Sequence, residues 1–224
     1  MLKLIRHMKI TYFLEVVSSW CHWAEPAWSE LKERYQGRAE FHWKIAQMTA
    51  EAYPASQAQC DWFYRRSGTL MRSPYMLNSN WFDSNLRADP APNLVAEAAK
   101  DFGVTGDTVR LAIAHAAVRE GKKVGRWEVV LPIAAQAGRI DPAKLEQAAR
   151  SAAVAARCQA STDEFNSLQV DQRPTFLLEN KIGDRVVFSG LARVEPLAAA
   201  VEAMLADEEG YASYAAHFGP VPPG

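Results

Sequence analysis

Cys21 stands where an apolar strand is expected to run into a helix, and this position makes it the residue most suited to nucleophilic chemistry. The stretch 14–24 reads LEVVSSWCHWA. A thiol at a helix N-terminus faces unpaired backbone N–H groups and the positive end of the helix dipole, and both stabilise the thiolate. We therefore expect Cys21 to be a reactive thiol. Ala24 occupies the position where a second cysteine would complete a Cys-x-x-Cys pair.

Three neighbours of Cys21 could adjust this chemistry. Glu15 lies among apolar residues, where a charged side chain is costly to bury without a partner or a proton-handling role; the alternative is that it faces solvent at a strand edge. A protonated His22 would favour the thiolate by Coulomb attraction, and His22 with Trp23 would contact substrate. An exposed His22 of no consequence is the competing interpretation.

The cysteine count and the N-terminus favour a reducing compartment. Cys21, Cys60 and Cys158 form an odd and sparse set, which makes a disulfide framework improbable. Cys60 and Cys158 are interpreted as core residues that could resolve a Cys21 adduct only if the fold brought them close. The apolar run in residues 1–8 is too short for a signal peptide, and Met8 is an alternative start. We expect a cytoplasmic protein that does not span a membrane.

Composition excludes several function classes. The 224 residues are 49% hydrophobic and 23% charged, with a net charge of −1, which is ordinary for a globular protein and gives no basic excess for nucleic acid or anionic lipid. The sequence contains no Gly-rich phosphate loop, zinc-ligand cluster or Gly-x-Ser-x-Gly motif. We therefore expect no metal and no tightly bound cofactor.

The apolar periodicity predicts an α/β protein that a run of helices interrupts. Residues 8–17 and 39–48 read as strands around a helix at 23–35 that Gly37 ends. A hairpin of strands 175–179 and 185–188 and a closing helix around Leu197, Val201 and Leu205 follow much later. The resulting parts are 8–53 and 166–208 for the α/β fold, 54–165 for a helical insertion and 209–224 for a C-terminal tail.

Helix start and stop signals divide the insertion. A first helix is expected at 55–66, followed by a long aromatic loop with Tyr75, Trp81 and Phe82. Beyond simple packing, this loop would form a lid or wall over an apolar substrate, or a dimer contact. Asn93 is expected as the N-cap of the next helix. Further helices are expected at 107–121, at 126–137 and at 141–157, and a capping box at Ser161 and Glu164 predicts one more short helix.

The chain resembles the DsbA family of thioredoxin-fold proteins. The family carries Leu-Glu on its first strand, a serine three residues after the Glu and the reactive cysteine three further on, the pattern of Leu14, Glu15, Ser18 and Cys21. The run RPTFLL from Arg173 is similar to the family's cis-proline before a buried strand. About 150 residues separate Cys21 from Pro174, which is enough for the helical insertion of DsbA-like chains. FrnE-like oxidoreductases, 2-hydroxychromene-2-carboxylate isomerase and kappa-class glutathione transferase are related.

The resemblance implies a thioredoxin fold with an all-helical insertion, and it assigns roles. Glu15 would lie beneath the active-site helix and modulate the thiol. Pro174, if cis, would place a backbone edge opposite Cys21 for pairing with a thiol peptide such as glutathione, with Ser18 nearby. Arg173 could bind a carboxylate or remain a surface cation.

Three functions stay open on this basis. The first is a thiol-disulfide oxidoreductase that uses Cys21 alone, with glutathione or another thiol as second reactant. The second is a glutathione-dependent isomerase or transferase of small aromatic metabolites, in which the missing second cysteine prevents oxidation of glutathione. The third is a non-catalytic binding module. The partners would be a small thiol and a small-molecule or protein disulfide substrate, and a homodimer stays open.

Overall fold

A four-stranded mixed sheet forms the centre of the computed structural model, which describes residues 8–86 and 88–221. The strands, in the order β2-β1-β3-β4, are β1 (Met8–Leu14), β2 (Ala39–Ile45), β3 (Thr175–Asn180) and β4 (Arg185–Ser189). β1 pairs in parallel with β2 and antiparallel with β3, and β3 pairs antiparallel with β4. This arrangement confirms the predicted thioredoxin-type α/β fold.

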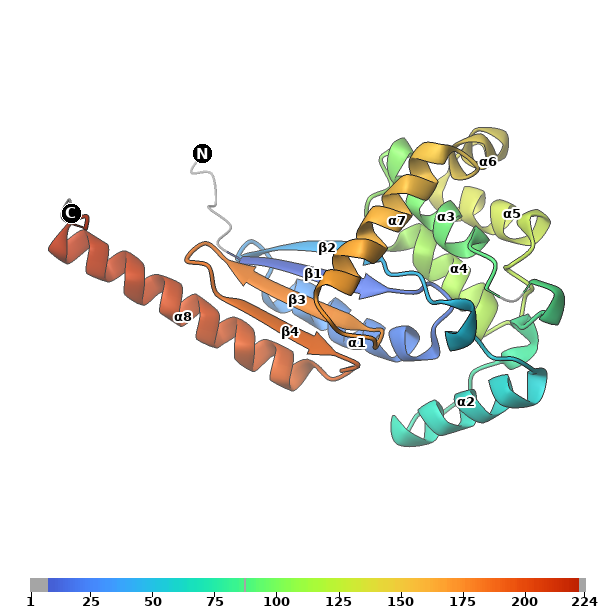
Figure 1. The fold of residues 1–224 in the computed structure, drawn as a ribbon, viewed down its shortest axis with the longest axis horizontal. Coiled ribbons are helices and arrows are strands. Elements are labelled where there is room, and N and C mark those ends of the chain that lie inside the picture. Colours follow the sequence, from blue (N-terminus) through green and yellow to red (C-terminus); the bar gives the residue numbers. More distant parts are fainter. Residues whose placement is uncertain (1–7, 87, 222–224) are drawn as a thin grey trace.

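Helices cover both faces of the sheet and form a separate cluster at one end (Figure 1). They are α1 (Ser19–Arg34), α2 (Gln57–Leu70), α3 (Ala91–Ala98), α4 (Thr108–Val118), α5 (Trp127–Gly138), α6 (Pro142–Ala149), α7 (Ala152–Ser167) and α8 (Val194–Phe218). The six helices α2 to α7 lie between β2 and β3 in the sequence, as the helical insertion requires.

The alternation of side chains along β1 produces a separate core on each face of the sheet. On one face Tyr12 stacks on Phe176 and meets Trp28 of α1, with ring centroids 4.8 and 5.3 Å away. On the other face Phe13 packs against Phe165 of α7 at 6.0 Å. All five rings are almost fully buried, which fixes α1 and α7 on opposite faces.

A buried ion-pair cluster joins α1 to the insertion. The Arg110 guanidinium, only 2% exposed, donates to both carboxylate oxygens of Glu25 at 2.6 and 2.9 Å and also to Asp107. The Tyr12 hydroxyl contacts Glu25 at 3.2 Å and donates to the Cys21 carbonyl at 3.0 Å. The first two turns of α1 are therefore held by contacts from both β1 and α4.

Some boundaries near the start of the chain differ from the prediction. β1 ends at Leu14, and residues 15–18 form a turn closed by the hydrogen bond from the Ser18 amide to the Glu15 carbonyl, 3.1 Å. α1 begins at Ser19, four residues earlier than expected. Asn93 is not an N-cap, because it lies inside α3 with its side chain bound to the Val16 amide at 3.2 Å.

The later helices also differ from the prediction. The expected single helix 141–157 is two helices, since the Ser151 side chain caps a new N-terminus at the Val154 amide. The separate helix expected at Ser161 is wrong, because residue 161 lies inside α7 and its hydroxyl donates to the Ile45 carbonyl at 2.6 Å.

The predicted tail from residue 209 is helical through Phe218, because α8 continues well past the sheet. Residues 222–224 lie outside the described residues. Residues 1–7 also lie outside them, and the expectation that the chain has no signal peptide depends on those residues. None of the described helices has the length and apolar character to cross a bilayer.

Candidate functional site at the N-terminus of α1

Ser18 caps the first turn of α1. Its backbone is extended, with φ −71° and ψ 127°, and its Oγ accepts from the Cys21 amide at 3.3 Å, while its carbonyl accepts from the His22 amide at 3.0 Å. Within the described part of the chain, the backbone amides of Ser19 and Trp20 have no hydrogen-bond acceptor. The positive end of α1 therefore keeps two free N–H donors beside the Ser18 hydroxyl.

A cavity of about 220 Å³ opens at this helix end. The lining includes Ser18, Ser19 and Trp20 of the helix end. It also includes Gln172 and Arg173, the two residues that precede Pro174 and its cis peptide bond. Its remaining lining, mostly aromatic or charged, is Val17, Met48, Ala52, Tyr53, Pro54, Phe63, Tyr64, Arg66, Trp81 and Asp171. None of the three cysteines lines it, so the helix N-terminus meets the cavity through Ser18, which is 9% exposed, and through the more exposed Ser19 and Trp20.

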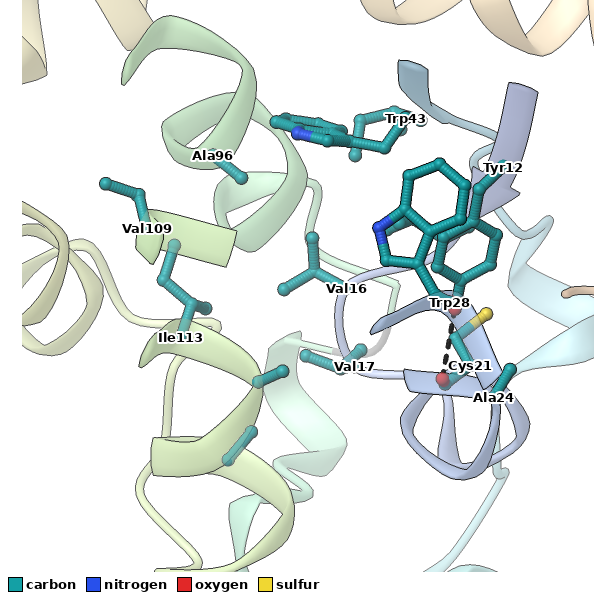
Figure 2. Close-up of a cluster of buried hydrophobic side chains, with 14 of the residues drawn as sticks. Tyr12, Val16, Val17, Cys21, Ala24, Trp28, Trp43, Ala96, Val109 and Ile113 are labelled. Atoms are coloured by element: carbon teal, nitrogen blue, oxygen red, sulfur yellow. Dashed lines mark hydrogen bonds between the residues drawn. The ribbon is translucent and has the colours of Figure 1, made fainter. Parts of the chain in front are cut away.

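Cys21 does not have the activated thiol that the sequence predicts. It lies one turn into α1, is 3% exposed, and sits in the apolar cluster beside Tyr12, Trp28 and Ala24 (Figure 2). Burial raises the pKa of the Cys21 thiol to about 11, and this outweighs the hydrogen bonds from the Glu15 backbone and the Ser18 side chain, which favour the anion. The helix dipole acts on Cys21, but the loss of solvent around the sulfur dominates.

His22 does not supply the positive charge that was expected beside Cys21. Burial and the neighbouring Arg119 lower the pKa of His22 to about 4, so the imidazole is neutral near pH 7. Its Nε2 lies 3.2 Å from the Tyr75 hydroxyl. Trp23 is 8% exposed and donates its indole N–H to Ser67 at 3.1 Å. Both side chains contact the helical insertion. Neither residue lines the 220 Å³ cavity, and both line a different pocket.

Glu15 is buried, so the interpretation that it faces solvent is wrong. It is 1% exposed just after β1, and its carboxylate accepts from the Met48 amide at 3.0 Å and from the Asn93 side chain at 2.7 Å. Burial raises the pKa of Glu15, and its hydrogen bonds to Met48, Tyr53 and Asn93 oppose that rise. Glu15 therefore connects the turn before α1 with the segment after β2 and with α3.

The Arg173–Pro174 bond is cis, as the resemblance implied. The Arg173 guanidinium donates to the carbonyls of Ala46 at 2.8 Å and Gln47 at 2.7 Å and lies 4.3 Å from the Phe165 ring. It is also close enough to Cys21 and Glu15 for their charges to act on its pKa, which burial lowers. Arg173 is thus a fixed structural cation at the cavity wall and not a free surface residue.

The other two cysteines are core residues, as interpreted from the sequence. Cys60 and Cys158 are fully buried, on α2 and α7, and burial raises the pKa of each to about 12. The aromatic loop contributes Trp81 to the cavity wall, and its Phe82 is buried. This placement favours the role of the loop as a wall over the site.

Sequence reasoning named Ser18 but missed its position as the cap that faces the cavity. The spacing Ser18-Ser19-Trp20-Cys21 is that of an N-cap serine and the amide it binds, which could have signalled a helix start at 19. Trp20, Tyr53 and Gln172 were not identified from the sequence as lining residues. Tyr53 and Gln172 come from segments that only the folded chain brings to α1.

The chain matches the DSBA-like thioredoxin domain family over residues 9–202. It belongs to this family. The resemblance found in the sequence is thereby confirmed for nearly the whole chain. No curated protein matches the sequence.

Several solved structures are similar to this fold. A candidate protein disulfide isomerase from Nitrosomonas europaea aligns with a TM-score of 0.71 at 15% identity, over 90% of this chain and 98% of that one. The cytosolic disulfide reductase DsbM from Pseudomonas aeruginosa gives 0.67 at 19%, over 88% and 98%, and has also been solved with GSH. 2-Hydroxychromene-2-carboxylate isomerase gives 0.62 at 15%, over 91% and 98%. At such identities the likeness establishes the fold.

Proposed function

We propose that this protein binds glutathione at the N-terminus of α1 and uses the glutathione sulfur, in place of a protein thiol, as the nucleophile of an isomerase or transferase reaction. The observation that carries this proposal is the division of roles within one helical turn: Ser18, 9% exposed, lines the cavity, while Cys21, 3% exposed, does not line it and has its pKa raised to about 11. A sulfur supplied from solution is the one that can meet the positive end of α1.

The N-terminus of α1 offers three donors to such a sulfur. The Ser18 oxygen serves as acceptor for the Cys21 amide, and its hydrogen, which faces the Cys21 thiol, would turn to such a sulfur when glutathione binds. The Ser19 and Trp20 amides add two more donors at the positive helix end, where anions are stabilised. A glutathione thiolate held there would be deprotonated at a lower pH than in water.

The cavity walls suit the remainder of a tripeptide and a flat second substrate. Arg66 is exposed at the rim and stacks on Trp62 and Phe63, at 4.8 and 5.3 Å, so it can bind a carboxylate. Trp20 and Trp81 are half-buried in the lining and offer aromatic faces. A cytoplasmic location would supply the glutathione, and small aromatic electrophiles are the class of second substrate that we propose.

Thiol-disulfide exchange through Cys21 is the second candidate, and the structural likeness to a disulfide reductase solved with GSH favours it. In that reaction the Cys21 thiolate would attack oxidised glutathione, breaking its S–S bond to form a mixed disulfide and release one glutathione thiolate, and an external thiol would resolve the mixed disulfide because Ala24 cannot. It requires the first turn of α1 to open, since the sulfur is buried.

Two variants separate the candidates. We expect conjugation of glutathione to chlorodinitrobenzene to persist in Cys21→Ala and to fall by about tenfold or more in Ser18→Ala, the loss typical of one donor to a developing anion. We also expect intact mass spectrometry after incubation with oxidised glutathione to show no adduct. An adduct on Cys21, with insulin reduction that Cys21→Ala abolishes, would establish the disulfide mechanism instead.

A further inference from the structure

The distal half of α8 carries an apolar stripe that the rest of the described chain leaves uncovered. Residues at alternating spacings of three and four pack the first half of α8 on the sheet, among them Leu197, Val201 and Met204. The same spacing continues through Glu208 to Tyr211, Ala215 and Phe218. Figure 1 shows α8 extending beyond the sheet, with its C-terminal end away from every other labelled element.

The aromatic residues of this segment are exposed together. Tyr211, Tyr214 and Phe218 are 66%, 62% and 65% exposed, and the rings of Tyr214 and Phe218 lie 4.5 Å apart. Beside them is a groove of about 670 Å³, lined by Gly37, Arg38, Lys181, Ile182, Leu205, Glu208, Glu209, Tyr211, Ala212 and Ala215. An aromatic tip next to an apolar groove on the same helix is the kind of exposed patch that marks an interaction surface.

We propose that this surface binds a second copy of the chain, with the distal halves of the two α8 helices antiparallel across a two-fold axis between Tyr211 and Ala212. Phe218 and Leu205 are equally far from this midpoint along the helix, on opposite sides of it, so the two-fold axis places Phe218 of one copy across from Leu205 of the other. The two-fold operation therefore brings the aromatic tip of each helix to the groove beside Leu205 of its partner, so that both ends of the contact are filled at once.

Charge and size select the antiparallel arrangement. Asp207, Glu208 and Glu209 form an acidic cluster in the middle of α8. A parallel pair would place the two clusters against each other, whereas the antiparallel pair places Glu208 across from Ala215 and Glu209 across from Tyr214. Small residues near the midpoint, Gly210 and Ala212, let the backbones approach, and a Cβ built at residue 210 meets nothing within 4 Å.

Sedimentation velocity of the full chain tests this proposal. We expect a species of twice the chain mass, and we expect Phe218→Asp to raise the dimer dissociation constant by about tenfold or more, because an aromatic anchor would be replaced by a charge in an apolar groove. Ser213→Asp is the matched control on the opposite side of the helix and should leave the dimer intact. Unchanged circular dichroism would show that both variants fold.

Cysteine cross-linking checks the register. Ala212→Cys lies at the proposed axis and should form an intermolecular disulfide on mild oxidation, while Ser213→Cys should not; the native cysteines are all buried and provide no background. A monomeric wild-type protein, a dimer that Phe218→Asp leaves unchanged, or a groove filled by residues 1–7 of the same chain would each overturn the proposal.

Discussion

Ser18 and Cys21 are both buried, and one helical turn separates them, but Ser18 lines the cavity and Cys21 does not. The hydroxyl meets the cavity and the free amides of α1, while the thiol lies among Tyr12, Trp28 and Ala24. Proximity to a helix N-terminus lowers a thiol pKa only where the anion keeps solvent or donors. At Cys21 burial dominates, and the helix end is available to an external sulfur instead.

A cysteine at the cap position should restore disulfide chemistry. Ser18→Cys would place one thiol at the cavity and leave Cys21 as its buried partner at Cys-x-x-Cys spacing, so we expect insulin reduction where the parent has little. Ala24→Cys is the matched control: residue 24 is fully buried, and its thiol would not reach the cavity. Activity gained by Ala24→Cys and not by Ser18→Cys would place the reactive position at Cys21.

The native cysteines should resist alkylation near neutral pH. Burial raises the pKa of Cys21 to about 11 and those of Cys60 and Cys158 to about 12, so the thiolate fraction is small below pH 9 and grows as the pH approaches these values. Peptide mapping after iodoacetamide treatment of the folded protein should show Cys21 labelled first as pH rises. Rapid labelling of Cys21 at pH 7 would contradict its burial.

Among the elements, α1 depends on a contact that no local pattern reveals. Strand and helix types followed from periodicity, and Gly37, with φ 81°, ends the α1 region as predicted. α1 begins before the predicted residue 23 because the Ser18 side chain caps it by binding the Cys21 amide. The Glu25–Arg110 pair joins residues 85 positions apart, which sequence spacing alone cannot relate.

Loss of the Arg110 contact should destabilise the protein strongly. Arg110→Met leaves the part-buried carboxylate of Glu25 without its cationic partner, while Asp107 keeps its contacts with Lys32 and Trp28, and we expect the free energy of unfolding to fall by about 3 kcal/mol. Arg34→Met on the same helix α1 removes an exposed pair with Glu30 and should change the free energy of unfolding far less. Urea denaturation measures both; equal effects would show that the buried cluster does not hold α1.

At the scale of the whole molecule, the site combines segments that the helical insertion separates in the sequence. Ser18 and Trp20 come from the start of α1, Tyr53 from the segment after β2, Trp81 from the aromatic loop and Gln172 from the turn before β3. The family resemblance predicted that the cysteine and proline segments would meet. The cavity composition was not predictable, because it depends on how the insertion packs against α1.

The ultraviolet absorbance of the thiolate of bound glutathione, followed as a function of pH, tests the central claim most directly. We predict that the bound thiol ionises at lower pH than free glutathione in both the wild type and Cys21→Ala, because the Ser18 hydroxyl and the N-terminus of α1 stabilise the anion. The shift should be reduced in Ser18→Ala. A thiolate signal that disappears in Cys21→Ala and persists in Ser18→Ala would contradict the account.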